Sequence, residues 1–297
     1  MTHTNDLSII LPAKNEARPL SVLLPKLKNL YSDAEIIVVD DGSTDETKDV
    51  CLQNGVTVIS HPYTLGNGAS IKSGARYAKG KILIFMDADG QHDPEDIEVL
   101  LNKLNEGYEM VIGARNASTH ASIARLTANS VFNRFASIMT GHNILDLTSG
   151  FRVVRARHFR KFIYLLPNGF SYPTTITMAF FRSGLPVVYV PINARTRTGK
   201  SKIRLFHDGF RFMLIIVKIG ALFSPMRFFL PISLFLFVIG ISYYLYTYIN
   251  IGRFTNMSAL LFTSSLLVFL IGILSEQISA LHYKGANEDA RHIKRED

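Results

Sequence analysis

Apolar and polar residues alternate in short runs over the first 200 or so positions of the chain. The predicted strands are Leu7–Ala13, Ile36–Val39, Val56–Ser60 and Lys81–Asp87, and helical patterns occupy residues 18–31 and 67–78. Strands that alternate with helices favour βαβ units and a parallel sheet. Ser43 or Thr44 is expected to cap the helix after the second strand, with Asp45 and Glu46 in its first turn.

The pattern changes in the last third of the chain, where two long uncharged stretches appear. Phe228–Tyr248 contains no charged residue, and neither does Ser258–Leu274, which continues more weakly to Leu281. A membrane helix needs about 20 apolar residues, so we expect spans at about 228–248 and 258–278. Core helices of a soluble domain are the alternative, but such helices rarely run so long without a charge. A group of tyrosines is also typical of an interfacial belt: Tyr243, Tyr244, Tyr246 and Tyr248.

Positive charge predicts the orientation of this hairpin. The basic residues before the first span are Arg195, Arg197, Lys200, Lys202, Arg204, Arg211, Lys218 and Arg227, and those after the second are Lys284, Arg291, Lys294 and Arg295. The connecting loop carries only Arg253. The positive-inside rule therefore places both termini, with the N-terminal domain, in the cytoplasm.

The same composition divides the chain into four parts. Residues 203–223 mix apolar and basic positions, as helices lying in the membrane interface do; a third span is disfavoured because it would contain Lys218. We expect a soluble domain at 1–205, juxtamembrane interfacial helices at 206–226, two membrane helices within 227–281 and a cytoplasmic tail at 282–297.

Charge and cysteine content narrow the classes of protein. Among 297 residues the formal net charge is +8 and the only cysteine is Cys51, so a disulfide framework is excluded and a reducing cytosolic face is expected. The first residues lack a signal-peptide pattern, and no cleaved signal is expected. Nucleic-acid binding is disfavoured because the basic residues gather beside the spans and no recognition motif appears.

Acidic residues follow the predicted strands. They are Glu16, Asp40, Asp41, Asp87 and Asp89. Ligands bind beyond the carboxyl ends of parallel strands, so these residues are expected to share one edge. The stretch DADGQHD, 87–93, has three interpretations: a solvated turn, a calcium loop, or a divalent-cation site facing a nucleotide. A calcium loop requires glycine where His92 stands, whereas Mg²⁺ or Mn²⁺ takes oxygen ligands completed by substrate phosphates.

Two glycine-containing segments carry little weight as nucleotide motifs. GNGASI, 66–71, begins like a dinucleotide fingerprint but ends in Ile71 and follows a loop instead of the first strand. GARYAKGK, 74–81, has one residue too many for a phosphate loop and lies on a predicted helix. Neither predicts a binding site.

Four motifs occur in one order along the chain: PAKNE (12–16), VVDDGSTDET (38–47), GNGASIKSGARYAKGKILIFMDADGQHDPE (66–95) and SGFRVVRA (149–156). Together they closely resemble family 2 glycosyltransferases with the GT-A fold. More narrowly, the chain resembles the dolichol-phosphate-mannose synthase branch, which makes polyprenyl-phosphate sugars. The resemblance covers about residues 6–205, and the two spans are similar to those of membrane-anchored members. It implies a Rossmann-like α/β domain with a mostly parallel sheet flanked by helices.

The resemblance also implies roles for individual residues. A nucleotide-sugar donor, with UDP or GDP, would contact Pro12, Ala13, Asn15, Glu16, Asp41 and Asp87. A bound Mg²⁺ or Mn²⁺ would be held by Asp87, Asp89 and Gln91, and catalysis would use Asp89, Arg115 and Arg125. The acceptor phosphate would face Ser149, Arg195, Arg197, Lys200 and Lys202. As alternatives, any of the arginines is an ordinary solvated surface residue, and the four basic residues at 195–202 bind anionic lipid headgroups.

The acceptor is predicted from a missing carboxylate. A hydroxyl acceptor would need a general base, yet residues 169–181, where many family 2 enzymes supply one, contain no Asp or Glu. A lipid monophosphate has a second pKa of about 6 and is already largely dianionic at neutral pH. It needs cations to position it more than a base, so we expect a polyprenyl phosphate acceptor and transfer with inversion.

Three other functions are alternatives to a polyprenyl-phosphate glycosyltransferase. A processive polysaccharide synthase is disfavoured because its Q-x-x-R-W motif needs a tryptophan and this chain has none. A transferase to diacylglycerol or to a protein-linked glycan is the nearer alternative. A non-catalytic nucleotide-binding membrane scaffold would have lost Asp87, Asp89 or Gln91. The sequence leaves the sugar, the nucleotide, the polyprenol and the oligomeric state open, a homo-oligomer included.

Overall fold

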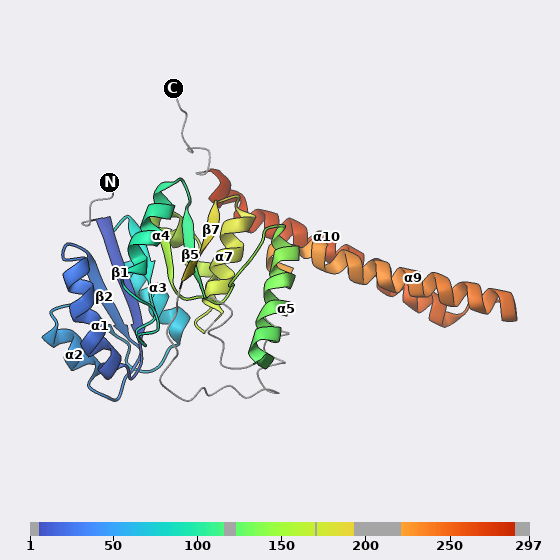
Figure 1. The fold of residues 1–297 in the computed structure, drawn as a ribbon. Helices are drawn as coiled ribbons and strands as arrows, with labels where there is room; N and C mark the ends of the chain where they lie inside the picture. The colour runs from blue at the N-terminus through green and yellow to red at the C-terminus, as the bar shows by residue number, and fades with distance from the viewer. Residues whose placement is uncertain (1–5, 116–122, 170, 193–220, 289–297) are drawn as a thin grey trace, which may run out of the picture. The chain divides into compact units, whose positions relative to one another are not determined.

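The computed structural model describes residues 6–115, 123–169, 171–192 and 221–288 (Figure 1). The chain divides into two compact units. One comprises residues 1–137 and 142–202, and the other comprises residues 138–141 and 203–297.

A seven-stranded sheet forms the centre of the first unit. Its strands are β1 (Leu7–Ala13), β2 (Glu35–Asp40), β3 (Thr57–Ser60), β4 (Ile82–Phe85), β5 (Met110–Arg115), β6 (Arg152–Arg155) and β7 (Val187–Ile192). Their order is β3-β2-β1-β4-β6-β5-β7. All neighbours pair in parallel except β6, which runs antiparallel to β4 and β5. The predicted mostly parallel α/β sheet is confirmed.

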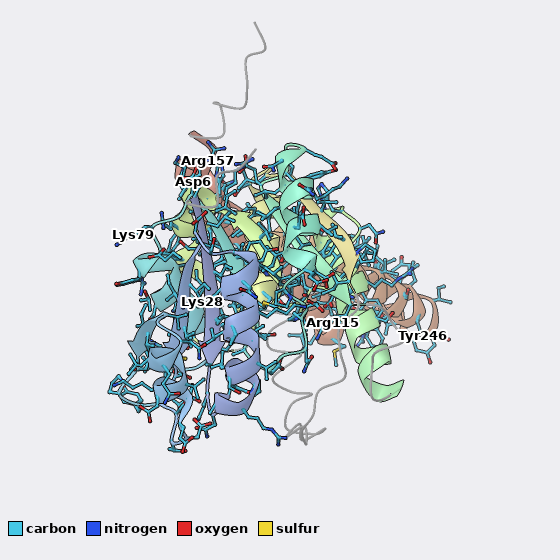
Figure 2. The ribbon with its side chains drawn as sticks, turned by 60° about the vertical axis from the view of Figure 1, so that its left-hand side comes forward. Asp6, Lys28, Lys79, Arg115, Arg157 and Tyr246 are labelled. Atoms are coloured by element: carbon cyan, nitrogen blue, oxygen red, sulfur yellow. The ribbon has the colours of Figure 1, made fainter. Side chains whose placement is uncertain are left out.

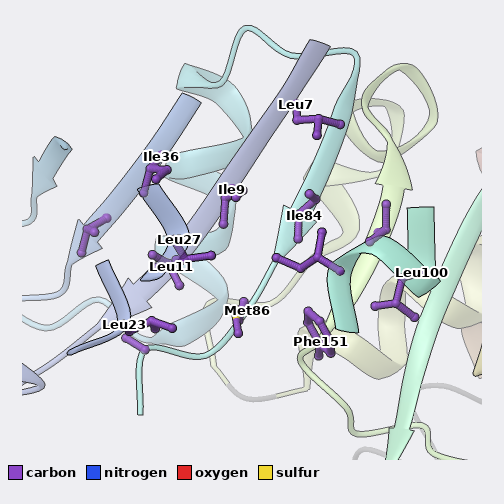
Figure 3. Packing of buried hydrophobic residues seen from close by; sticks show 14 of the residues in the cluster. Leu7, Ile9, Leu11, Leu23, Leu27, Ile36, Ile84, Met86, Leu100 and Phe151 are labelled. Atoms are coloured by element: carbon purple, nitrogen blue, oxygen red, sulfur yellow. The ribbon is translucent and has the colours of Figure 1, made fainter. Parts of the chain in front are cut away.

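Helices cover both faces of this sheet. They are α1 (Ala17–Leu30), α2 (Thr47–Gln53), α3 (Asn67–Tyr77), α4 (Asp96–Asn105), α5 (Ile123–Thr140), α6 (Ala156–Lys161) and α7 (Tyr172–Arg182), with a short 3₁₀ turn, η3, at Ile163–Leu165. One core cluster joins α1 and α4 to alternate strand residues such as Ile9, Leu11 and Ile84 (Figure 3). On the other face Phe85 meets Phe159 of α6, with ring centroids 4.6 Å apart. Because successive side chains of a strand point to opposite faces, the residues of one apolar strand pack against the helices on both faces of the sheet.

The second unit contains a hairpin of two long helices, α9 (Pro225–Ile251) and α10 (Asn256–Glu288) (Figure 1). Both are long and apolar enough to cross a membrane, and only 11% and 17% of their most apolar stretches are buried within the protein. The predicted hairpin is confirmed. Its turn is tighter than predicted: α9 ends at Ile251 and is followed by Gly252, whose φ of 67° is a backbone conformation that glycine adopts readily.

Small residues form the contact between the two helices. Apart from Pro225 at the start of α9, the buried positions among the described side chains of the two helices are all small: Ser233, Gly240 and Thr247 on α9 and Ser258, Ser265, Gly272 and Ser279 on α10. Along each helix they recur every seventh position, which is the spacing of a left-handed helix pair. Ser233 Oγ donates to Ser265 O and Ser265 Oγ to Ser233 O, each at 2.9 Å. Small residues allow close backbone approach where lipid provides no hydrophobic force between helices.

One prediction about the first unit is wrong. The helix after β2 begins at Thr47, and neither Ser43 nor Thr44 caps it. Ser43 Oγ instead accepts a hydrogen bond from Asn15 N, and the Asp45 carboxylate accepts from Ala17 N. These contacts join the loops after β1 and β2, and that long-range use of the polar residues is why the local capping pattern failed. The predicted interfacial helices lie largely at 206–220, outside the described residues.

Candidate active site

The polar residues that follow β1, β2 and β4 lie at one edge of the sheet, because these strands are parallel neighbours. β5 runs antiparallel to β6, which itself runs antiparallel to β4, so β5 ends at the same edge with Arg115. Figure 2 shows Arg115 far from Asp6, which precedes β1 at the opposite edge. The candidate residues that follow β1, β2 and β4 therefore lie, with Arg115, on one side of the domain, as predicted from the carboxyl ends of parallel strands.

The loop after β1 is held by Asn15. This residue has a φ of 57°, an uncommon backbone conformation that asparagine tolerates better than most residues. Its Oδ1 accepts a hydrogen bond from Thr44 N at 2.8 Å, and Glu16 N donates to Thr47 Oγ1 at 2.9 Å. Pro12 and Ala13, which are also predicted to contact the nucleotide, are the last two residues of β1. The loops after β1 and β2 thus form one fixed wall.

Asp41 is buried, and its carboxylate is engaged within the protein. Oδ1 accepts from Leu65 N at 2.8 Å and Oδ2 from Gly66 N at 2.9 Å, and His61 Nδ1 lies 2.8 Å from Oδ1. Burial opposes ionisation, but the hydrogen bonds from His61 and the two amides outweigh it and lower the pKa of Asp41. Asp41 therefore orders the loop that leads into α3. Its predicted contact with a nucleotide stays a prediction.

The acidic pair after β4 is held from two sides. The Asp89 carboxylate accepts from Gln91 N at 3.2 Å and from Gln91 Nε2 at 2.9 Å, so Gln91 orients Asp89. The backbone of Gly150 lies against Asp87: a Cβ at position 150 would sit 2.9 Å from Asp87 Oδ2. His92 Nε2 lies 3.8 Å from the same oxygen, and its ring stacks on Phe151.

Arg115 lies beside the acidic pair and is fixed by Asp146. Its Nε donates to Asp146 Oδ2 at 2.8 Å and its Nη2 to Asp146 Oδ1 at 3.1 Å, with a further bond from Nη2 to Thr148 Oγ1 at 2.8 Å. Burial lowers the pKa of Arg115, but Asp146 raises it more, and Asp87 and Asp89 add to the rise. Burial likewise opposes ionisation of Asp146, yet Arg115 and Thr148 bring its pKa below the ordinary value. A charge-assisted fork of this kind is rigid.

The structure describes only some of the remaining predicted residues, which are the acceptor residues and the predicted catalytic residue Arg125. Ser149 is 1% exposed, and its hydroxyl donates to Gly113 O at 2.6 Å, so contact with an acceptor phosphate would require that bond to be given up. Arg125 lies on α5, but its side chain falls outside the described part of the chain. The basic residues Arg195, Arg197, Lys200 and Lys202 are also outside it.

Four residues of this region were not predicted as site residues: His61, His92, Asp146 and Arg152. Asp146 lies 31 positions from the arginine that it holds, and no local pattern links the two. A signal existed for Arg152, because it belongs to the SGFR motif (149–152). Its burial, however, depends on the antiparallel strand β6, which the alternation of helices and strands did not reveal.

The oxygen ligands at this edge fit a divalent cation that takes some of its ligands from the protein and the others from a substrate. Within the described ranges, no group of three or more His, Cys, Asp and Glu side chains could hold a metal ion. Asp87 and Asp89 therefore offer two carboxylates and not a closed protein cage. Mg²⁺ is usually bound by one or two carboxylates together with substrate phosphates and water, and this arrangement matches that chemistry.

Comparison with known proteins identifies the family. Residues 8–163 match glycosyl transferase family 2, and residues 224–281 match the GtrB C-terminal hairpin. The chain belongs to glycosyl transferase family 2. Its GT-A-like domain and C-terminal hairpin confirm the predicted resemblance to the polyprenyl-phosphate branch of that family.

Individual relatives support this assignment. The putative glycosyltransferase CsbB of Bacillus subtilis is 28% identical over 94% of this chain and 88% of its own length. The undecaprenyl-phosphate mannosyltransferase of Micrococcus luteus is 29% identical over 65% of this chain and 86% of its own. Among solved structures, glucosyl-3-phosphoglycerate synthase of Mycobacterium tuberculosis, in complex with Mn²⁺, UDP and glucosyl-3-phosphoglycerate, superposes with a TM-score of 0.59 at 20% identity. That match covers 72% of this chain and 78% of the other, and at this identity it shows the fold alone.

Proposed function

We propose that this glycosyltransferase moves a sugar from a nucleotide-sugar, with UDP or GDP, to a polyprenyl phosphate at the cytoplasmic face of a membrane. The observation that carries the proposal is the braced pair Asp87 and Asp89, beside Arg115, in a chain that ends in a lipid-compatible hairpin. Relatives named as undecaprenyl-phosphate and dolichyl-phosphate transferases support the acceptor class.

The donor would be bound through its diphosphate. Asp87 and Asp89 would hold Mg²⁺ or Mn²⁺, which when bound neutralises the leaving diphosphate as a Lewis acid. Gln91 keeps the Asp89 carboxylate in one orientation, and Arg115, itself fixed by Asp146, adds positive charge beside the pair. Pro12, Ala13, Asn15, Glu16 and Asp41 stay the proposed contacts of the nucleoside.

The acceptor side would work without a general base. Helix α7, Tyr172–Arg182, carries no acidic residue, and a phosphate monoester that is already ionised needs none. The basic residues at 195–202, with Arg125 and Ser149, are proposed to position it. Attack opposite the leaving group would invert the anomeric centre, so an α-linked donor would give a β-linked lipid product.

A donor panel tests this function. Purified full-length protein in detergent is incubated with undecaprenyl phosphate, Mn²⁺ and radiolabelled UDP- and GDP-sugars, one at a time, and the lipid is extracted into organic solvent. We expect label in the lipid for one donor and none after chelation of the metal. In a parallel incubation with diacylglycerol in place of undecaprenyl phosphate, label in diacylglycerol with none in undecaprenyl phosphate would support the alternative acceptor class.

A further inference from the structure

Arg152, the first residue of β6, is a fully buried charged side chain close to the acidic pair. It is 0% exposed, and a guanidinium in the protein interior loses the hydration that it has in water. Within the described ranges, no carboxylate lies within ion-pair distance of it. Arginine is rarely buried without such a partner, so the hydrogen bonds and the charge of Arg152 are expected to contribute to the structure of the neighbouring site.

The guanidinium ties two backbone segments together. Its Nη1 donates to Pro173 O and to Thr177 Oγ1, both at 3.2 Å, and its Nη2 donates to Ser149 O. The first two acceptors lie on α7, and the third lies in the turn that precedes β6. One side chain therefore fixes the first turns of α7 to the turn beside the acidic pair.

That turn is the surface against which Asp87 rests. A Cβ at Gly150 would lie 2.9 Å from Asp87 Oδ2 and 3.0 Å from Oδ1, so the glycine backbone leaves room for the carboxylate and nothing more. Ser149 is also anchored, through Oγ, to Gly113 O. A shift of the turn by a few tenths of an ångström would move Asp87 or release it.

The positive charge of Arg152 also acts on the nearby carboxylates. Burial lowers the pKa of Arg152, and Tyr172, Tyr189, Asp146 and Asp87 act in the opposite direction. Arginine stays protonated in proteins, so a fixed positive charge lies behind a site where carboxylates gather. In a low-dielectric interior, such a charge reduces their mutual repulsion more than a solvated one would.

We propose that Arg152 is a positioning residue, which holds the Ser149–Gly150 turn against Asp87 and sets that carboxylate for a metal-bound diphosphate. The inference rests on the proposed function of Asp87. It also links α7, the segment from which many family 2 enzymes supply a general base, to the Ser149–Gly150 turn through a single side chain. A purely structural arginine would contribute to folding and leave the affinity for metal and nucleotide unchanged.

Calorimetric titration of Mn²⁺ with UDP, and separately with GDP, into the full-length protein in detergent tests this. Arg152→Met should weaken binding of the metal–nucleotide pair by about 10–100-fold, the range for residues that orient metal ligands. Arg152→Lys, which keeps the charge but not the forked donors, should lie between Arg152→Met and wild type. Arg157→Met is the control, since Arg157 is 61% exposed and pairs with Glu109, and it should bind as wild type does.

The outcomes separate the inference from the function on which it rests. If wild type binds and both Arg152 variants bind equally well, Arg152 only supports the fold and the inference is overturned. If Arg152→Met does not fold, Arg152→Lys and Gly150→Ala decide: the latter keeps the guanidinium but crowds Asp87, and wild-type affinity in both would overturn the inference. If wild type binds neither nucleotide with Mn²⁺, the proposed function fails first.

Discussion

The two units of the chain bury opposite kinds of residues. In the α/β unit, Leu24, Ile84 and other large apolar side chains are fully buried. In the hairpin, large apolar side chains such as Leu234 (58% exposed) and Leu274 (64% exposed) face outward, while Ser233 and Ser265 are buried. The candidate site residues of the α/β unit lie at the carboxyl edge of its sheet, whereas Ser233 and Ser265 of the hairpin bond to each other between the two helices.

This inversion indicates that the units are adapted to different solvents. Water drives large apolar groups into the core of the first unit, whereas hydrocarbon accepts them at the surface of the second. The two proposed substrates, a water-soluble nucleotide-sugar and a membrane-bound lipid phosphate, come from those same two phases. The contrast between the two units supports a transferase that acts where water meets the membrane.

The largest effect is expected at the acidic edge of the α/β unit. Asp89→Ala should lower kcat/KM for sugar transfer on the order of 10³-fold. Without this carboxylate the proposed cation would no longer be held, and the negative charge that develops on the leaving diphosphate would not be neutralised. Asp49→Ala, an exposed carboxylate in the first turn of α2, is the matched control and should be silent. Retained turnover of Asp89→Ala in the presence of metal would remove Asp89 from the site.

The same substitution made in each unit tests the inversion itself. Leu24→Ala should destabilise the α/β unit by about 2–5 kcal/mol, since it opens a cavity in a fully buried position. Leu234→Ala should lower the stability of the hairpin by less than about 0.5 kcal/mol, because the Leu234 side chain is exposed and faces solvent or lipid. Thermal melting of both variants in detergent measures the difference, and equal shifts in Tm would contradict the contrast.

The ion pair of Arg115 and Asp146 should make stability depend on pH. Folding lowers the pKa of Asp146, so this stabilisation is complete above the ordinary Asp pKa of about 3.9 and is lost as pH falls through the lower folded-state value. Asp146→Asn should cost about 3 kcal/mol at neutral pH, with the gap to wild type narrowing in acid. Denaturant melts at pH 7 and pH 3 measure both gaps, and a gap that widens in acid would refute the assignment.

The smallest effect is expected inside the hairpin. Ser233→Ala removes one of the reciprocal bonds to Ser265 and should destabilise the hairpin by about 0.6 kcal/mol, the average for such bonds between membrane helices. Ser242→Ala is the control, because Ser242 bonds only within its own helix, to Val238 O. Equal melting of the two variants would mean that the seam of small residues is held by packing alone.

The features of the fold that depend on short stretches of sequence were predicted from the pattern of apolar and polar residues. The strand Leu7–Ala13 has the bounds predicted for it, because an apolar run interrupted only by Ser8 and closed by Pro12 has few alternatives. The placement of Asp41, Asp87 and Asp89 at one edge of the sheet followed from parallel topology alone. The apolar length of α9 and α10 likewise predicted the hairpin, though not the seventh-residue spacing of its small residues.

Contacts between distant segments were not predictable in this way. The bond of Arg115 to Asp146, the burial of Arg152 and the use of Ser43 by Asn15 each join residues that lie 20 or more positions apart. They depend on β6 running antiparallel between β4 and β5 and on how two loops meet. A single sequence contains the residues of such contacts but not their pairing.

The most direct test of the account compares two acceptors that differ by one phosphate. Undecaprenyl phosphate and undecaprenol are each incubated in detergent with wild-type protein, Mn²⁺ and the donor that the panel identifies, and transfer of label into lipid is followed over time. A site that lacks a general base and positions an ionised phosphate should transfer sugar to undecaprenyl phosphate only. Comparable transfer to undecaprenol would contradict the central claim.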